Sequence, residues 1–245
     1  HTLKAQDSYI YTKDNKLFRL GLHSNKIIKD KDGKFLFRGI IQSINSFRSD
    51  IIQIESGYNY TLFLDSKGNV YGVGYNNKRQ MDVRPHQDRL HCIQILNQNK
   101  YNNIKYIGCC KDKSFMLNNK GTLYGCGTGY PGSSPFCEYK NILKFSCGIA
   151  RIGLILSRKK RLIMMGANEY GQCGVSLIAD IVKPTFININ DEILSVKCGD
   201  LHTIIKSESN EYYSFGNNNK GQCLIKNQKG KIYVPTLISI DQVKQ

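Results

Sequence analysis

Short runs of alternating apolar and polar residues recur along this chain, and residues typical of turns separate them. A first run begins at each of four isoleucines, which are Ile51, Ile104, Ile142 and Ile193. A second apolar run follows, and after a polar turn a third run ends at a glycine: Gly74, Gly127, Gly166 or Gly216. Alternation with a period of two, in runs rich in Ile, Val, Tyr and Phe, predicts β-strands.

A fourth apolar run completes most of these units. It lies at residues 35–41, 91–96, 184–189 and 235–240. In the unit that starts at Ile104, only residues 135–140 can take this role, so we expect a short outer strand there. Units of four antiparallel strands that repeat along a chain are typical of the blades of a β-propeller. The pattern therefore predicts an all-β fold made of such blades.

The units number five and cover the chain as a single domain. A diverged copy at residues 8–21 opens the chain, and residues 2–5 are the candidate for its inner strand. The approximate blades are residues 1–45, 46–98, 99–141, 142–190 and 191–245. Because every unit has a segment for its fourth strand, we expect five blades that close into a ring. The alternative is an arc of a larger ring, which would expose two sheet edges.

The last unit carries the most specific motif of the chain. It reads CGDLHT at residues 198–203, YSFGNNNKGQ at residues 213–222 and VPT at residues 234–236. This pattern resembles the regulator of chromosome condensation repeat, and the other units keep it in part. Where that repeat has histidine, as at His202, they have Tyr60, Lys113 and Arg151.

The resemblance spans essentially the whole chain and implies a β-propeller. Members of that family typically have seven blades, so the alternative to a closed five-bladed ring is part of a seven-bladed one. Family members use propeller faces to bind small GTPases or other proteins. The best-studied roles are nucleotide exchange on a Ran-type GTPase and chromatin binding. The resemblance implies a binding role but leaves the partner open, because fold does not determine function.

Residues that repeat in register are expected to serve the structure. Gln80, Gln172 and Gln222 should hydrogen-bond the backbone of the neighbouring blade. Cys147 and Cys198, which precede equivalent glycines, should be small buried hydrophobic residues. The nine cysteines form no C-x-x-C pair, which predicts free thiols and an intracellular location, cytoplasmic or nuclear.

Charge and candidate chemistry indicate a binding protein rather than an enzyme. The chain has 35 Lys and Arg against 19 Asp and Glu, a net charge of +16. This charge favours acidic partners: a protein, nucleic acid or chromatin. Anionic lipid is less favoured, because no amphipathic helix or lipidation motif is evident. Without a phosphate-binding loop or histidines at metal-ligand spacing, we expect no catalytic, cofactor or metal residues.

Antiparallel topology divides the candidate binding residues between two faces. The turns between second and third strands share one face, which gathers most of the clustered charge. Its basic residues are Lys13, Lys16, Lys67, Lys120, Arg158, Lys159, Lys160 and Arg161. The turns after the first and third strands share the opposite face, a weaker candidate. Its residues are Lys111, Lys113, Arg151, Asp200 and His202.

The first functional hypothesis is a monomeric, non-catalytic propeller that binds a small GTPase or another acidic partner. Because the chain starts at His1, we expect it to be a module of a larger protein. One alternative is a guanine-nucleotide exchange factor, which would use the loops at residues 75–89 or 217–233. Another is a binder of chromatin or of nucleic-acid backbone. Sequence-specific base recognition is disfavoured, because no aromatic residues lie among the basic turns.

Overall fold

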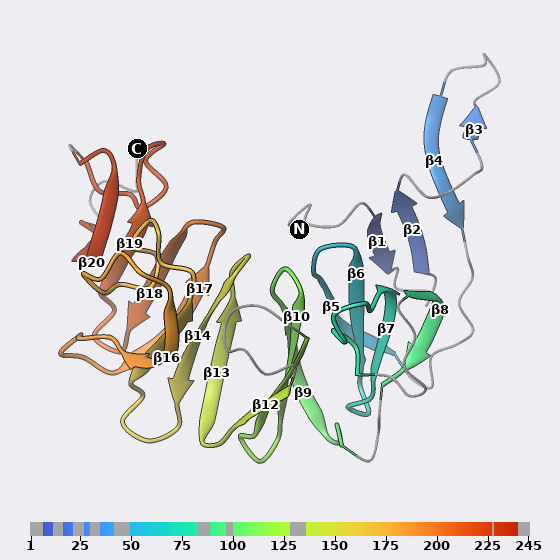
Figure 1. Ribbon diagram of the computed structural model, residues 1–245, viewed down its shortest axis with the longest axis horizontal. Helices are drawn as coiled ribbons and strands as arrows, with labels where there is room; N and C mark the ends of the chain where they lie inside the picture. Colours follow the sequence, from blue (N-terminus) through green and yellow to red (C-terminus); the bar gives the residue numbers. More distant parts are fainter. Residues whose placement is uncertain are drawn as a thin grey trace.

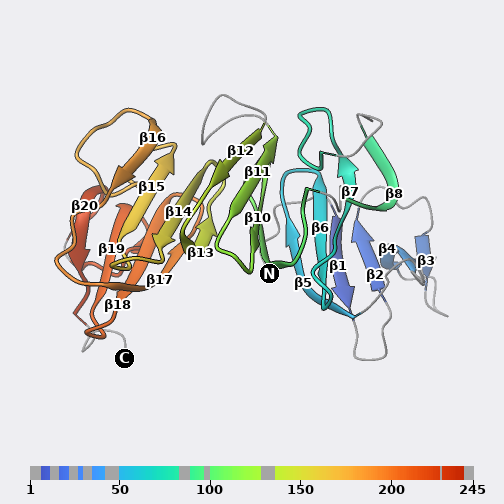
Figure 2. The same cartoon turned by 90° about the horizontal axis from the view of Figure 1, so that it is seen from below.

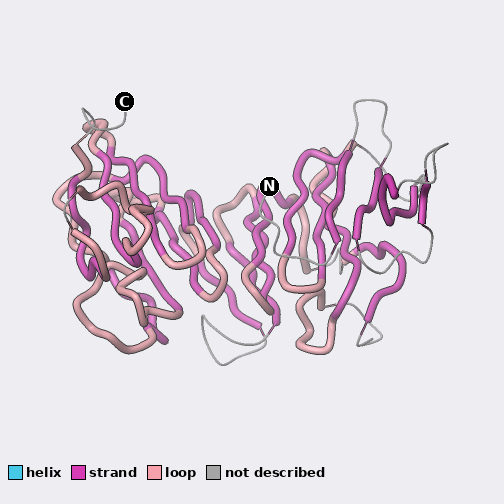
Figure 3. Tube along the Cα trace, turned by 90° about the horizontal axis from the view of Figure 1, so that it is seen from above, coloured by secondary structure: helices cyan, strands magenta, loops and turns pink. Residues whose placement is uncertain are grey.

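The computed structural model describes residues 7–11, 17–21, 27–29, 35–41, 50–82, 89–96, 100–127, 136–226 and 228–239. Within these ranges the secondary structure consists of strands and connecting loops, without a helix (Figure 3). A search of the same residues accordingly finds no helix with the length and apolarity needed to cross a membrane.

The strands form five four-stranded antiparallel sheets, each a blade-like unit. The first contains β1 (Asp7–Tyr11), β2 (Leu17–Gly21), β3 (Ile27–Lys29) and β4 (Phe35–Ile41). The second contains β5 (Ile51–Ser56), β6 (Tyr60–Asp65), β7 (Val70–Tyr75) and β8 (Arg89–Ile95). The third contains β9 (Ile104–Cys109), β10 (Lys113–Asn118), β11 (Leu123–Gly127) and β12 (Phe136–Tyr139).

The last two sheets repeat this plan. The fourth contains β13 (Ile142–Cys147), β14 (Arg151–Leu156), β15 (Leu162–Gly166) and β16 (Ile181–Phe186). The fifth contains β17 (Ile193–Cys198), β18 (His202–Ser207), β19 (Tyr212–Asn217) and β20 (Lys231–Leu237). In sheets two to five, strands adjacent in sequence are also adjacent in space. The short outer strand expected in the third unit is confirmed, because β12 has four residues.

The first sheet differs from the expected blade. Its order is β1-β2-β4-β3, so β4 pairs with β2 and the short β3 forms the outer edge. β4 covers residues 35–41 as the sequence predicts. The segment proposed as its inner strand, residues 2–5, lies outside the described residues.

The five sheets follow one another along an open arc (Figures 1 and 2). The first sheet, in blue, and the fifth, in red, lie at opposite ends of the longest axis in both views. The expected closure of five blades into a ring is therefore not observed. The physical reason is the small rotation from each sheet to the next, which leaves five sheets short of a full turn.

The core lies between successive sheets. Leu62 and Leu64 of β6 pack with Ile107 of β9 and Met116 of β10. Similar clusters join the third sheet to the fourth and the fourth to the fifth. β6 and β10 are buried at every position because sheets cover both of their faces. The hydrophobic effect thus stabilises the stacked arrangement rather than any single sheet.

The glycines that end each third strand are required by close backbone approach. Gly74 has φ of +107° and Gly216 has φ of +112°, both in the left-handed region. A Cβ on Gly74 would lie 2.4 Å from the carbonyl oxygen of Asn59, and one on Gly216 the same distance from that of Leu201. The repeated glycine therefore lets the third strand pass the turn that follows the first strand.

The repeated glutamines do not bond the neighbouring sheet through their side chains, so this expectation is wrong. The side-chain oxygen of Gln172 accepts the amide of Tyr170 in its own loop, at 2.7 Å. It is the backbone carbonyl of Gln172 that binds the next sheet, accepting the Thr203 hydroxyl at 2.8 Å. The glutamine side chain therefore keeps its own loop tight, and this loop places the backbone carbonyl of Gln172 within hydrogen-bond distance of the next sheet.

Candidate protein-interaction surfaces

The turns between second and third strands lie at one end of the sheets, which we call the hairpin end. The turns of the second, third and fourth sheets are each fixed to the following sheet through their backbones. The amide of Ile104 donates to the carbonyl of Gly68 at 3.3 Å. Likewise, the amide of Ile142 donates to the carbonyl of Gly121 at 2.9 Å. These bonds hold the side chains of successive turns in fixed relative positions.

The turn of the fourth sheet is longer and more strained than those of the second, third and fifth sheets. The Leu156 amide closes it by donating to the Arg161 carbonyl five positions on, at 3.0 Å. Lys159 and Lys160 have φ of 57° and 39°. Glycines adopt this left-handed conformation freely in the second and third sheets, but it costs other residues about 1–2 kcal/mol each. The fourth turn therefore holds two lysines where the fold favours glycine.

Lys160 is anchored to the fifth sheet. Its Nζ lies 2.6 Å from Oε1 of Glu208 and 3.5 Å from Oε2 of Glu192. The hydrogen bond with Glu208 is the main cause of a raised pKa for Lys160. The backbone carbonyl of Lys160 also accepts the amide of Ile193 at 2.9 Å. Much of the Lys160 charge is thus directed at carboxylates within the chain.

The four basic residues at positions 158–161, here called the basic quartet, therefore divide into two that contact other side chains and two that point outward at the tip. The guanidinium of Arg161 lies 4.3 Å from the ring centroid of Phe186 on β16, a cation–π contact. Arg158 and Lys159 are exposed at the tip of the turn. They form the most concentrated positive charge that the described hairpin end offers to a partner.

The other basic residues predicted for this surface fall into two groups. Lys67 and Lys120 are exposed on the turns of the second and third sheets, at the same end as Arg158 and Lys159. Lys13 and Lys16 lie outside the described residues. The basic surface supported by the structure therefore runs over the second, third and fourth sheets.

At the fifth sheet the hairpin end becomes acidic. A carboxylate oxygen of Asp191 accepts the amide of Ser209 at 3.1 Å and also its hydroxyl. These hydrogen bonds lower the pKa of Asp191 to about 2. With Glu192 and Glu208 nearby, this region would repel an acidic partner and so limits where one could dock.

The opposite end of the sheets, here called the loop end, carries the turns after the first strands and the loops after the third strands. Two residues proposed as binding residues on this end are buried, Lys113 and Arg151, each 1% exposed. Arg151 donates to the carbonyls of Asp200 at 2.7 Å and Gly199 at 3.0 Å. Buried side chains cannot contact a partner, so for these two residues the binding role predicted from sequence is wrong.

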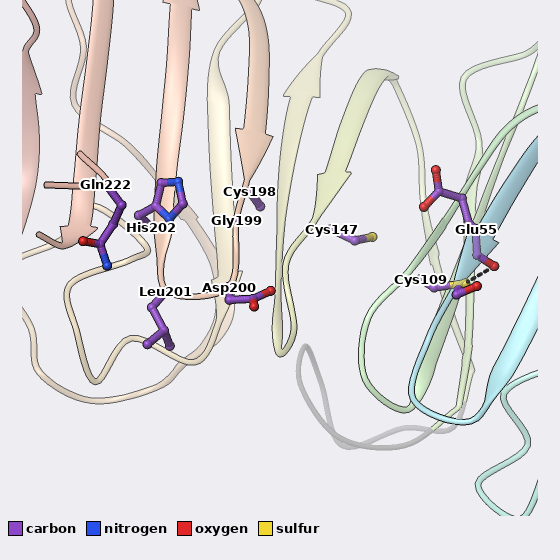
Figure 4. Close-up of a pocket in the computed structure, with 10 residues that line it drawn as sticks. Glu55, Cys109, Cys147, Cys198, Gly199, Asp200, Leu201, His202 and Gln222 are labelled. Atoms are coloured by element: carbon purple, nitrogen blue, oxygen red, sulfur yellow. Dashed lines mark hydrogen bonds between the residues drawn. The ribbon is translucent and has the colours of Figure 1, made fainter. Parts of the chain in front are cut away.

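The remaining loop-end candidates lie at the surface or beside a cavity. Lys111 is exposed, and its Nζ lies 5.6 Å from the ring of Tyr58. Asp200 and His202 line a cavity of about 430 Å³ (Figure 4). The cavity also touches the last residues of four successive inner strands, which are Ser56, Cys109, Cys147 and Cys198. Cys147 and Cys198 are thus only partly buried, contrary to expectation.

Burial favours the neutral forms of the thiols and the imidazole that line this cavity. Burial raises the pKa values of the Cys109 and Cys147 thiols, which keeps both protonated at neutral pH. Burial, with a smaller contribution from the charge of Arg151, lowers the pKa of His202. No group of three or more His, Cys, Asp or Glu side chains suited to a metal ion is found among the described residues. The described lining therefore presents protonated thiols rather than reactive thiolates.

Sequence reasoning missed the exposed apolar residues of the loop end. Leu177 and Ile178 are 60% and 62% exposed, and Leu224 is 47% exposed. The available signal was an adjacent aliphatic pair in a segment otherwise typical of a loop. Single exposed aliphatic residues are common, whereas groups of them often mark interaction surfaces.

Comparison with protein families identifies the repeats. Two models, both described as "Regulator of chromosome condensation (RCC1) repeat", match the chain. One covers residues 51–80 and 193–222, and the other covers residues 161–205.

Curated relatives are similar over limited regions. The X-linked retinitis pigmentosa GTPase regulator of Mus musculus is 34% identical over 79 residues, which is 31% of this chain and 8% of the relative. The guanine nucleotide exchange factor SRM1 of Saccharomyces cerevisiae is 23% identical over 190 residues, which is 68% of this chain and 39% of the relative. The matches thus span well under two thirds of either relative.

Solved structures share the fold along nearly the whole chain. Human WBSCR16 superposes with a TM-score of 0.75 at 17% identity, over 96% of this chain and 65% of the other. Yeast RCC1 (Prp20), solved bound to Kap60, superposes with a TM-score of 0.73 at 17% identity, over 96% of this chain and 59% of the other. The sheets are therefore blades of a β-propeller. The chain carries regulator of chromosome condensation repeats.

Proposed function

We propose that this chain is a non-catalytic binding module whose hairpin end docks an acidic face of a small GTPase. The observation that carries the proposal is the fourth-sheet turn. There Lys160 pairs with Glu208 and Arg161 lies over the ring of Phe186, while Arg158, Lys159 and Arg161 are all exposed to a partner. A turn whose backbone is fixed in this way needs little backbone ordering when its outward cations bind a partner.

The named relatives support the class of partner. One is called a GTPase regulator and another a guanine nucleotide exchange factor. A further structure of yeast Prp20p, 15% identical to this chain, is described with its binding properties to Gsp1p and histones. For this chain we propose the GTPase as partner because the fixed hairpin end offers one compact cationic area. Histone or nucleic-acid binding is the alternative, and it forms an outcome of the test.

The same assay addresses nucleotide exchange. An exchange factor must displace bound nucleotide, which requires an element that inserts at the nucleotide site. Among the described residues, the basic turns are short and fixed to neighbouring sheets, which suits docking better than insertion. We therefore propose that the chain regulates its partner by binding it, inside the cell and as a monomer.

The test titrates the chain into Ran- and Rho-type GTPases loaded with a fluorescent guanine nucleotide, at low and high salt. Anisotropy reports binding, and nucleotide release after addition of excess unlabelled nucleotide reports exchange. The proposal expects salt-sensitive binding to at least one GTPase without faster release. Faster release would instead support an exchange factor. Binding to a nucleosome or a DNA duplex, with none to any GTPase, would overturn the proposal.

A further inference from the structure

Two loops at the loop end together expose aliphatic and cationic side chains. The loop after β15 exposes Leu177 and Ile178, and the loop after β19 exposes Leu224. The second loop also contains three exposed lysines, Lys220, Lys226 and Lys229. We call these six residues the loop patch.

The first loop is held in a fixed shape, so the exposure of its aliphatic pair is built into the fold. The buried side chain of Asn168 donates its Nδ2 to the carbonyl of Leu177, and to that of Val175 at 3.4 Å. The amide of Asn168 donates to the carboxylate of Asp180 at 3.2 Å. Leu177 and Ile178 lie between these attachments, and turning them inward would break the bonds.

Leu224 occupies a position that the fold gives to glycine one sheet earlier. Gly174 lies six residues after Asn168, as Leu224 lies six residues after Asn218, and their φ values are 72° and 57°. A Cβ on Gly174 would approach the ring of Phe215 to 2.9 Å, which explains that glycine. A leucine that is 47% exposed and lies in the left-handed region recovers only part of its strain through packing, which points to a role at the surface.

The two loops are neighbours because the first loop packs against the start of β20, the strand that follows the second loop. The ammonium of Lys231, the first residue of β20, lies 5.1 Å from the ring centroid of Tyr170 in the first loop. A Cβ on Gly171 would come within 2.7 Å of the carbonyl oxygen of Ile232. The aliphatic pair and the lysines therefore belong to adjacent parts of the same end.

The charge of this surface is mainly positive. Lys220, Lys226 and Lys229 are exposed in the second loop, which has no acidic residue between Asn218 and Lys231. The first loop contributes the exposed Glu169 and also Asp180, whose carboxylate accepts the Asn168 amide. Three lysines against two carboxylates leave the two loops with a small positive net charge, and the lysines lie on the second loop, beside the loop that carries Leu177 and Ile178.

We propose that the loop patch binds an anionic membrane surface, with Leu177 and Ile178 inserted among the acyl chains and the lysines at the headgroups. Aliphatic insertion combined with lysines near anionic lipid is how peripheral proteins attach reversibly to bilayers. The sequence has neither an amphipathic helix nor a lipidation motif, and two fixed loops supply the same combination of groups. The proposal is independent of the GTPase proposal, because the patch and the hairpin end lie at opposite ends of the strands.

A bilayer fits the patch better than an acidic protein does. A protein partner would need a hydrophobic pocket shaped for the Leu177–Ile178 pair and acidic groups around it. A bilayer accepts any aliphatic pair that protrudes from a fixed loop, and its headgroups supply negative charge in every direction. Attachment at the loop end would leave Arg158 and Lys159 facing away from the membrane.

A tryptophan at the tip provides a direct readout, because the chain contains no Trp. The variant Ile178→Trp is mixed with phosphatidylcholine vesicles with and without phosphatidylserine. We expect a blue-shifted emission and quenching by brominated acyl chains only when phosphatidylserine is present. The chain without substitution, assayed by co-sedimentation with the same vesicles, shows whether the tryptophan itself creates the binding.

Matched variants separate insertion from general charge attraction. The pair L177D/I178D should weaken vesicle binding by about tenfold or more, since it replaces two inserted aliphatic side chains with carboxylates. The pair K226E/K229E should weaken it by about tenfold and reduce its salt dependence. The pair K67E/K120E makes the same charge change at the hairpin end and should retain binding. L237D, at an exposed residue near that end, should also retain it.

Several results would overturn the proposal. One is the absence of binding to anionic vesicles under low salt. Another is binding that K67E/K120E weakens as much as K226E/K229E does, which would mean diffuse charge attraction. A third is binding without a blue shift and without sensitivity to L177D/I178D. If the patch variants abolish capture of an acidic protein while vesicles do not bind, the patch is a protein site.

Discussion

Lys160 of the fourth sheet and Glu208 of the fifth form an ion pair, with 2.6 Å between Nζ and Oε1. The pair decides how much of the basic quartet a partner can use, because it draws one of the four cations toward the acidic fifth sheet. Arg158 and Lys159 remain outward at the tip. The boundary between the basic and acidic parts of the hairpin end therefore lies between these two sheets.

Glu208→Gln should strengthen binding of an acidic partner. The substitution releases Lys160 toward the partner and removes a negative charge beside it, so we expect about a two- to threefold gain in affinity at low salt. Titration of the same GTPase at two salt concentrations measures it. Glu169→Gln makes the same charge change at the loop end. If both variants change affinity equally, the local pairing of Lys160 has no part in binding.

Arg151→Ala should destabilise the fold. The buried guanidinium donates to three carbonyls of the fifth sheet, those of Gly199, Asp200 and His202, and its loss removes these charge-assisted hydrogen bonds together with the packing of a buried side chain. We expect a loss of about 3 kcal/mol in the free energy of unfolding. Urea denaturation measures this loss. Arg158→Ala, at an exposed arginine, should change the free energy of unfolding by less than about 0.5 kcal/mol. Similar losses for the two variants would contradict a stabilising role for the hydrogen bonds of Arg151.

Gly216→Ala should also destabilise the fold, through backbone strain and a clash with the Leu201 carbonyl, 2.4 Å from the new Cβ. The expected loss is about 2 kcal/mol or more. Gly221→Ala is the matched control, because Gly221 has φ of +76° with nothing within 4 Å of the added atom. Its free energy of unfolding should fall by only about 1 kcal/mol, because the left-handed backbone conformation alone disfavours the added Cβ. Equal losses in urea denaturation would show that close approach does not constrain Gly216.

Alkaline pH should weaken the fold through its buried thiols. Burial raises the pKa of Cys223 to about 11 and that of Cys173 to about 12, whereas an unfolded thiol ionises near 9. The stabilisation from these protonated thiols is complete below pH 9 and declines as pH rises toward the folded pKa values. Each thiol should contribute a slope of about 1.4 kcal/mol per pH unit. Cys173→Ala should flatten the pH dependence of unfolding between pH 9 and 11, and an unchanged slope would refute this assignment.

Features that depend on local sequence could be predicted. Alternating residues in runs such as Tyr60–Asp65 give strands, and the glycine that ends each third strand marks a backbone crossing that side chains would block. The short β12 follows from the absence of a longer apolar run before Ile142. Each of these features requires only a few neighbouring residues.

Features that depend on the relation between sheets could not be predicted. The open arc results from the rotation between successive sheets, which side-chain packing sets over long sequence distances. Arg151 has the charge of a surface residue, yet its guanidinium is surrounded by carbonyls some fifty positions away. The quartet at residues 158–161 likewise gives no sign that Glu208 and Phe186 hold half of it. The sequence shows the Leu177–Ile178 pair in a loop segment, but only the structure shows that both side chains are exposed.

The most direct test of the central claim is the affinity of the R158E/K159E variant for the GTPase that binds the unsubstituted chain. Both side chains are exposed, so the variant should fold normally. If the hairpin end is the docking surface, R158E/K159E should lose about tenfold or more of the affinity at low salt and show a reduced salt dependence. K220E/K226E, an equal charge change at the loop end, should bind as the unsubstituted chain does. Unchanged affinity of R158E/K159E would contradict docking through the hairpin end.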